Sequence, residues 1–284
     1  IVDTKVGYLL GISPSFQVDR AQADHARIDA MLQDFVIREN VEELLTESVK
    51  MASSTGYTYW LMYINKEGGA SITHVDPWEV IAIKDRSTGE ITNVLRYYYL
   101  SINGDRRIRA EWYDATYVYF YLEDEKGDFI LDYTEEPKPH GFTCVPFIEL
   151  ENNREKQGDC DKVLNLIDAY DRGLSDLSSE VEQMRLAYLV LTGAELEDGA
   201  IERAKQTGVF EIPDVANQSK VPTLEYLTKD LNTTSVENLL ATLEKNILRF
   251  ARSVNFTDES FGGNISGVAM KYKLFGLETK TAYT

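Results

Sequence analysis

Apolar positions along the chain follow two different periods, and the period predicts which elements form. Residues 1–19 are interpreted as extended structure broken by Gly11 and Pro14. From Arg20 the spacing is helical. The apolar positions at this spacing are Ile28, Met31, Leu32, Phe35 and Val36, followed by Val41, Leu44, Leu45 and Val49. The pattern therefore predicts two helices ahead of Gly56, separated at Asn40.

Between Gly56 and Leu150 the period changes to two, which is typical of strands with one buried face. The short segments rich in Tyr, Ile and Val are YTYWLMYI (57–64), ITHV (72–75), VIAIKD (80–85), ITNVLRYYYL (91–100), RIRAEWYD (107–114), TYVYFYLED (116–124) and FILDY (129–133). The turn signals KEGG, RSTGE, NGD and EKGD separate several of them. We expect an antiparallel, meander-like sheet over this region.

Two later stretches carry apolar residues at alternating steps of four and three, the spacing of a heptad stripe. The first stripe is Val163, Ile167, Tyr170, Leu174, Leu177, Val181, Met184, Tyr188 and Leu191; the second is Val236, Leu240, Leu243, Ile247, Phe250 and Val254. They predict a long helix over Cys160–Leu191 and a second one capped by Thr234 or Ser235. Because an antiparallel pair buries only one stripe, we expect both helices to pack on further partners, such as copies of the chain.

A short excursion separates the two predicted helices. It contains a helical turn within Leu196–Lys205 and two strands, VFEI (209–212) and LEYL (224–227). A Gly-rich loop follows the second helix, and a third helix is predicted to start at Ser266 or Gly267. The predicted fold class is α+β: a sheet-rich domain with helices, plus a long antiparallel helix hairpin with a small α/β tip.

Composition restricts the function classes. The 47 acidic and 29 basic residues give a net charge of −18, which argues against ordinary DNA binding through Lys and Arg. The two cysteines form no CxxC, so neither a metal knuckle nor a disulfide framework is predicted, and a reducing cytosol is the simplest setting. No apolar run reaches the roughly 18 residues of a membrane span. The sequence begins at Ile1 without an initiator Met and ends at Thr284 a few turns into a helical pattern, so we expect a chain truncated at both ends.

The sequence offers no catalytic or metal motif. His25, His74 and His140 fall in three different predicted elements and share no spacing with the cysteines, so no metal site is predicted. No G-x-S-x-G elbow occurs, and carboxylates are too numerous for any pair to indicate acid–base catalysis. Those on the first long helix are interpreted as a solvated face: Asp161, Asp168, Asp171, Asp176, Glu180 and Glu182.

The Gly-rich loop FGGNISG (261–267) can be compared with phosphate-binding motifs. Gly262 and Gly267 have the separation of a P-loop, but Val268 and Ala269 replace its Lys and its Ser or Thr. The preceding element is a predicted helix rather than a strand, so the βαβ context is missing as well. The loop is therefore interpreted as a turn between helices with Ser266 as a possible N-cap, and no cofactor is predicted.

Several segments, taken in order, resemble a known family. The run LEKNILRFARSVNFTDESFGGNISGVAMKYKLFGLETK (243–280) resembles a block typical of the portal proteins of tailed bacteriophages of the siphophage type. Further resemblances to the same family are KVGYLLG (5–11), MASSTGYTYWLMYIN (51–65), ITHVDPWEVIAIKD (72–85) and LIDAYDRGLSDLSSEVEQM (166–184). Together these segments span nearly the whole chain in the family's order. The ordered set is stronger evidence for the resemblance than any one segment.

The resemblance implies a portal fold with the family's division into parts. Residues 1–157 would form the wing, 158–191 the first stem helix, 192–232 the clip, 233–254 the second stem helix, 255–266 the tunnel loop, and 267–284 the start of a wing or crown helix. The loop residues that would face DNA in the channel are Asn255, Thr257, Asp258, Glu259, Ser260 and Asn264. The stripe residues Val163 to Val181 and Val236 to Phe250 would pack the stem.

The leading hypothesis from the resemblance is a structural protein that forms a ring, usually dodecameric, at one capsid vertex. DNA would be packaged and ejected through the ring, with double-stranded DNA only transiently in the channel and no catalytic centre in the chain. Implied partners are the terminase large subunit, head-completion or adaptor proteins, and capsid and scaffolding proteins. The implied location is the virion, with assembly in the cytoplasm of the host bacterium. Two alternatives stay open: a nucleotide-binding enzyme that uses the Gly-rich loop, and an unrelated cytosolic helical scaffold.

Overall fold

The computed structural model describes residues 1–19, 21, 24–102, 104–184, 188–192, 199–207, 223–227, 233–256, 266–282 and 284. They form two compact units, which we call the sheet unit (residues 1–164 and 248–284) and the helix-pair unit (165–247). The structure combines helices with antiparallel sheets, as the predicted α+β class requires. Among the described residues, every buried hydrophobic side chain lies in the sheet unit.

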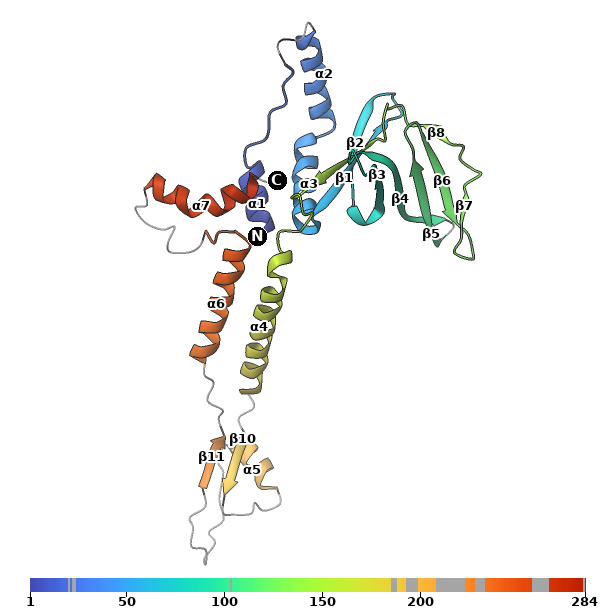
Figure 1. Cartoon of the computed structure of the whole chain (residues 1–284). Helices are drawn as coiled ribbons and strands as arrows, with labels where there is room; N and C mark the ends of the chain where they lie inside the picture. Colours follow the sequence, from blue (N-terminus) through green and yellow to red (C-terminus); the bar gives the residue numbers. More distant parts are fainter. Residues whose placement is uncertain are drawn as a thin grey trace, which may run out of the picture. The chain divides into compact units, whose positions relative to one another are not determined.

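The helices predicted ahead of Gly56 are confirmed as α2 (His25–Arg38) and α3 (Val41–Thr55) (Figure 1). Asn40 separates them with a left-handed backbone (φ 48°), a conformation that Asn tolerates better than most residues. α3 packs against the first strand, and its Ser48 hydroxyl accepts a hydrogen bond of 2.6 Å from the Trp60 indole. No side chain of α2 is buried.

The prediction of extended structure over residues 1–19 is wrong for its first half, because Val2–Leu10 form helix α1. Lys5 and Val6 of this helix are buried, and α1 packs against both α3 and α7 (Gly267–Thr281). This tertiary packing outweighs the low helix propensity of a glycine in mid-helix. Because Val2–Leu10 is short, its apolar spacing alone does not predict a helix; the helix is explained by its packing against α3 and α7.

The predicted strands are present in order, with two further strands near the end of the region. Their bounds are β1 (Tyr57–Ile64), β2 (Ala70–Val75), β3 (Val80–Lys84), β4 (Ile91–Ile102), β5 (Asp105–Tyr113), β6 (Tyr117–Glu123), β7 (Phe129–Leu131), β8 (Lys138–Pro139) and β9 (Phe147–Glu151). A short 3-10 turn, η1 (Pro77–Glu79), connects β2 to β3.

The strands form two antiparallel sheets. The larger sheet has the order β3-β4-β5-β6-β7, with β8 pairing to β6, and its register sets Leu95 opposite Trp112. This confirms the predicted meander for β3 to β7. The smaller sheet has the order β2-β1-β9, in which Leu61 pairs with Phe147 across a long sequence separation. The pairing of β1 with β9 is not predictable from local periodicity.

The main core contains inward-facing residues of both sheets. Val94 of β4 is fully buried, and the rings of Tyr113 and Phe147 meet edge to face with centroids 5.0 Å apart. The sheet unit also pairs its buried charge internally. The carboxylate of Glu111 accepts hydrogen bonds from the hydroxyls of Tyr98 (2.7 Å) and Tyr113 (2.8 Å). Such satisfied contacts allow a carboxylate to be buried beside apolar rings.

The helix-pair unit contains α4 (Leu164–Met184, entered through the 3-10 turn η2, Asp161–Val163), β10 (Tyr188–Thr192), α5 (Ala200–Thr207), β11 (Thr223–Leu227) and α6 (Thr233–Phe250). β10 and β11 pair antiparallel, with Tyr188 opposite Leu227. The strand predicted at 224–227 is thus present, whereas the one predicted at 209–212 lies outside the described residues.

Both predicted long helices are too long by a few residues. The first ends at Met184 rather than Leu191, because Tyr188–Thr192 form a strand that pairs with β11. The segment YLVLT is rich in residues that favour strands, so pairing outweighs its helical spacing. The second helix ends at Phe250 rather than Val254. The backbone turns at Arg252, whose φ of 51° ends the helical run.

Candidate functional site

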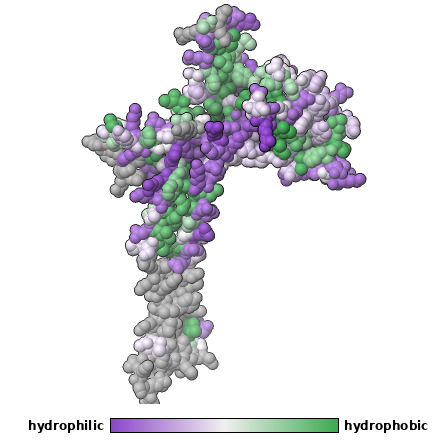
Figure 2. Space-filling model, in the orientation of Figure 1, coloured by the Kyte–Doolittle hydropathy of each residue, from purple (hydrophilic) through white to green (hydrophobic). Residues whose placement is uncertain are grey.

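The apolar stripes of α4 and α6 are only half covered. Of the side chains described in these helices (164–182 and 234–250), none is buried. Gly173 of α4 lies close to α6, since a Cβ added there would stand 3.3 Å from Cδ2 of Leu240. Figure 2 shows apolar side chains along this part of the molecule, flanked by polar ones. The two helices therefore present apolar surface that the described residues of one copy leave uncovered.

The predicted stripe residues differ in how exposed their side chains are. Val163 is fully buried in the sheet unit, whereas Leu174 and Val181 are each about half exposed, at 48% and 49%. Phe250, at the end of α6, is 57% exposed. The remaining members are of intermediate burial: Ile167, Tyr170, Leu177, Val236, Leu240, Leu243 and Ile247. No described side chain of the helix-pair unit is buried.

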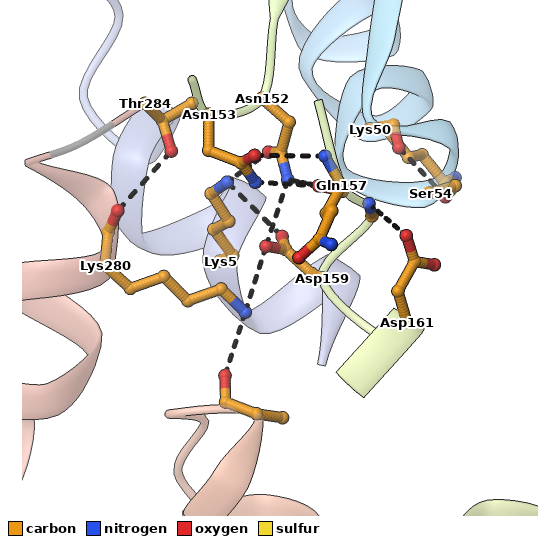
Figure 3. A network of polar contacts seen from close by, with 12 residues as sticks. Lys5, Lys50, Ser54, Asn152, Asn153, Gln157, Asp159, Asp161, Lys280 and Thr284 are labelled. Carbon is orange, nitrogen blue, oxygen red and sulfur yellow. Dashed lines mark hydrogen bonds and ion pairs between the residues drawn. The ribbon is translucent and has the colours of Figure 1, made fainter. Parts of the chain in front are cut away.

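A buried polar network lies in the sheet unit between α1, the segment 152–161, α7 and the turn after α6 (Figure 3). The Asp159 carboxylate pairs with two ammonium groups, Lys280 Nζ at 3.2 Å and Lys5 Nζ at 3.3 Å. Lys5 also donates a hydrogen bond to Asn152 Oδ1. The side chains of Lys5 and Asp159 are almost completely buried, with 1% and 4% exposed.

The network contains two lysine ammonium groups but only one carboxylate, that of Asp159. Burial alone would raise the pKa of Asp159, but the positive charges of Lys280 and Lys5 outweigh it and hold that pKa below its ordinary value. For Lys5, burial is the larger influence and lowers the pKa of the ammonium despite Asp159. The network therefore favours the ionised aspartate, and its single carboxylate is shared by two lysines, so one cation has no carboxylate of its own.

The segment that carries Asn152 and Asp159 is held tightly against the end of α3. The Asp159 amide donates to Ser53 O at 2.7 Å, and the Asn152 amide donates to Gly56 O at 2.9 Å. Gly56 has a φ of 96°, and a Cβ there would stand 2.1 Å from the carbonyl oxygen of Lys156. Only glycine allows this approach. These backbone contacts hold the Asp159 segment in position independently of the two lysine side chains.

Lys280, near the C-terminal end of α7, links that helix to the end of α6. Its ammonium donates a hydrogen bond of 2.9 Å to the carbonyl of Ala251, directly after α6, while it pairs with Asp159. At the other end, the Ser266 hydroxyl accepts from the Ala269 amide at 3.3 Å, which confirms Ser266 as the N-cap of α7. Both helices are therefore anchored to the same network.

Of the residues predicted to face DNA, only Asn255 is described, and it is of intermediate exposure. The others lie outside the described residues: Thr257, Asp258, Glu259, Ser260 and Asn264. Sequence analysis missed the network of Lys5, Asn152, Asp159 and Lys280. The polar run NNREKQGD (152–159) contains Asn152 and Asp159 and is the local sequence signal of this network. Within the described ranges, no helix is both long and apolar enough to cross a membrane.

Comparison with known proteins agrees with this architecture. A family model described as "Phage portal protein, SPP1 Gp6-like" matches residues 1–283. The portal protein of Bacillus phage SPP1 is 27% identical over 296 residues, covering 99% of this chain and 57% of that protein. The portal protein of Clostridium phage phiCD119 is 26% identical over 304 residues, covering 99% and 64%.

The chain thus spans about three fifths of the length of each of these two relatives. The portal family is a structural one, and nothing in the comparisons favours a nucleotide-binding enzyme or an unrelated helical scaffold. The match over nearly every residue agrees with the resemblance carried by the sequence segments. The chain belongs to the SPP1 Gp6-like family of phage portal proteins.

Proposed function

We propose that the chain is the ring-forming part of a portal, a structural conduit through which phage DNA is packaged and later ejected. The observation that carries the proposal is the helix pair: α4 and α6 have apolar stripes at heptad spacing, yet none of their described side chains is buried. Apolar surface of this kind is typical of an interface that other copies complete. Membership of the portal family supplies the biological setting.

The parts of the chain suit distinct roles in such a ring. Residues 1–157 would be the wing, because they contain the self-contained core. Residues 158–191 and 233–254 would supply the stem, with helices at 164–184 and 233–250, and residues 192–232 the clip. Residues 255–266 would be the tunnel loop that lines the channel, and α7 would lead toward the crown. A dodecameric ring is the stoichiometry we propose.

The partners follow from the role of a conduit at a capsid vertex. The ring would be part of the virion and would assemble in the host cytoplasm with capsid and scaffolding proteins. The terminase large subunit and later the head-completion proteins would dock on it, and ATP hydrolysis would belong to the terminase. With a net charge of −18, the chain would hold passing DNA only weakly, since each phosphate neutralised by a cation adds to binding.

The test is native mass spectrometry and electron microscopy of the full-length protein, combined with complementation of a phage that lacks its portal gene. We expect a closed ring with an axial opening, and restored packaging. A full-length protein that stays monomeric at all concentrations, or a ring that does not restore packaging, would contradict the proposal. A matched control is the same protein with Leu174→Asp, which should fold but should not close the ring.

A further inference from the structure

A basic hollow lies beside the buried network in the sheet unit. It has a volume of about 840 Å³ and is lined by six cationic side chains: Lys5, Arg154, Lys162, Arg249, Arg252 and Lys280. Only two carboxylates, Glu155 and Asp159, share the lining. Six cations against two anions leave a net charge of +4 around the hollow, in a chain whose net charge is −18. The hollow therefore attracts an anionic partner.

Most of these cations have no counter-charge among the residues that the structure describes. Lys5 and Lys280 share Asp159. The other four are exposed and form no ion pair with any described residue: Arg154, Lys162, Arg249 and Arg252. The contrast with the large sheet is clear, because Arg96 and Arg109 there each approach two or more carboxylates. The four exposed cations of the hollow thus differ from Arg96 and Arg109, whose charges are paired within the sheet.

Arg252 occupies a backbone position that does not suit arginine. Its φ of 51° is left-handed, directly after the end of α6, where Gly or Asn is usual. Residues other than Gly and Asn adopt this conformation rarely, because their Cβ is crowded there, so the surrounding structure must hold Arg252 in place. The side chain lines the hollow. Strain retained at a charged residue beside a cavity points to a role for the charge itself.

Helix α4 provides an exposed surface of the opposite charge. Helix α4 has five carboxylates and a single basic residue, Arg172, over its 21 residues. Four of the carboxylates are exposed and make no ion pair with the described residues: Asp168, Asp171, Asp176 and Glu182. The net charge of α4 is therefore −4, which balances that of the basic hollow.

Copies that each carry a charge of −18 repel one another, so a stable ring requires opposite charges across its interface. A contact between two different patches is heterologous, and it produces a ring when the rotation closes. We propose that the basic hollow of one copy receives the acidic face of α4 from the adjacent copy. This inference rests on the proposed function and deepens it, because it names the two surfaces that join neighbouring copies.

DNA is the competing anionic partner for the hollow. Four unpaired cations per copy, repeated around a ring, would bind backbone phosphates tightly, with a log–log salt slope of about −0.9 for each phosphate neutralised. Tight binding would oppose the movement of DNA through a conduit. The carboxylates of α4, in contrast, are present in every copy and are fixed on a helix.

Charge reversal in the full-length protein tests the contact. Arg249→Glu with Arg252→Glu should raise the concentration needed for half-assembly by about tenfold or more at low salt, and so should Asp168→Arg with Asp171→Arg. The chain with all four substitutions regains opposite charges and should assemble within about threefold of the wild type, as a double-mutant cycle requires. Arg106→Glu with Arg107→Glu, on β5, is the matched control and should assemble normally.

Each outcome decides between the proposals. A wild type that forms rings while the two charge-reversed variants assemble equally well overturns the inference and leaves the proposed function standing. Failure of the four-substitution chain to regain assembly, with an unchanged thermal midpoint, also overturns the inference. A wild type that never assembles overturns both. The last measurement is binding of short duplex DNA to the assembled protein. If Arg249→Glu with Arg252→Glu abolishes this binding but leaves assembly unchanged, the hollow binds phosphate and the inference is overturned.

Discussion

The sheet unit and the helix-pair unit differ in how completely they bury their apolar side chains. In the sheet unit the two sheets enclose a core that includes Val94, Tyr113 and Phe147, and Glu111 has hydrogen-bond partners within the chain. In the helix-pair unit the described side chains of α4 and α6 stay at least partly exposed. The difference suggests that one region folds to completion within a single copy and the other requires additional copies.

The largest expected effect concerns assembly. Leu174→Asp with Val181→Asp places charge on the half-exposed stripe of α4 and should abolish ring formation, because an unpaired charge would be buried at the interface. The thermal midpoint of the unassembled chain should not change. Sedimentation velocity measures the assembly and calorimetry the midpoint. Tyr133→Asp, at a side chain 87% exposed in the sheet unit, is the control; a ring that still forms in the stripe variant would refute the comparison.

The next effect concerns the stability of each unit. Phe147→Ala removes a ring buried between the sheets and should lower the free energy of unfolding by about 3–5 kcal/mol. Leu174→Ala, on the exposed stripe, should change it by no more than about 0.5 kcal/mol in the unassembled chain. Urea denaturation measures both. Equal losses for the two substitutions would mean that the helix pair already has a core of its own.

A smaller effect is expected at the network that joins α6 to α7. Lys280→Met removes the contacts to Asp159 and to the carbonyl of Ala251, and leaves Asp159 with Lys5 alone. The lost charge-assisted hydrogen bonds should cost about 1.5–3 kcal/mol. Amides of α7 should exchange faster, while those of β4 and β5 should not change. Lys245→Met, an exposed lysine on α6, is the matched control. Unchanged exchange in α7 would exclude Lys280 as its anchor.

The smallest effect concerns pH. Burial would raise the pKa of Glu149, but hydrogen bonds from Lys156 and Lys84 hold it below the ordinary value of 4.5, and the pKa of Asp159 is held below 3.8. Ionised carboxylates of this kind contribute stability that is complete above pH about 4.5 and is lost as pH falls through the folded-state pKa. Denaturation at pH 3–7 should show this loss, and Glu149→Gln should make it shallower. Glu67→Gln, at an exposed residue, should not.

The sequence predicted the sheet unit better than the helix ends. Strands β1 to β7 follow local alternation and turn residues, which are readable without knowing their partners. Helix α1 and strand β10 were predicted wrongly, because the packing of Lys5 and Val6 and the pairing of Tyr188 with Leu227 depend on segments distant in sequence. The spacing of apolar residues within one segment does not show which distant segment it will pack against.

The candidate site was only partly predictable for the same reason. The stripe residues of α4 and α6 follow from heptad spacing alone. The polar network does not, since a buried lysine such as Lys5 has no local signature and Asp159 is one of many carboxylates. The cations of the basic hollow come from segments near residues 5, 154, 162, 250 and 280, so their convergence is a product of the fold.

The most direct test of the central claim is amide hydrogen exchange of the full-length protein before and after assembly. If other copies complete the helix pair, amides of α4 and α6 should become markedly slower to exchange on assembly, while those of β1, β4 and β5 should keep the same rates. Equal exchange of α4 and α6 in the unassembled and assembled states would contradict the account, because it would mean that these helices gain no new packing from neighbouring copies.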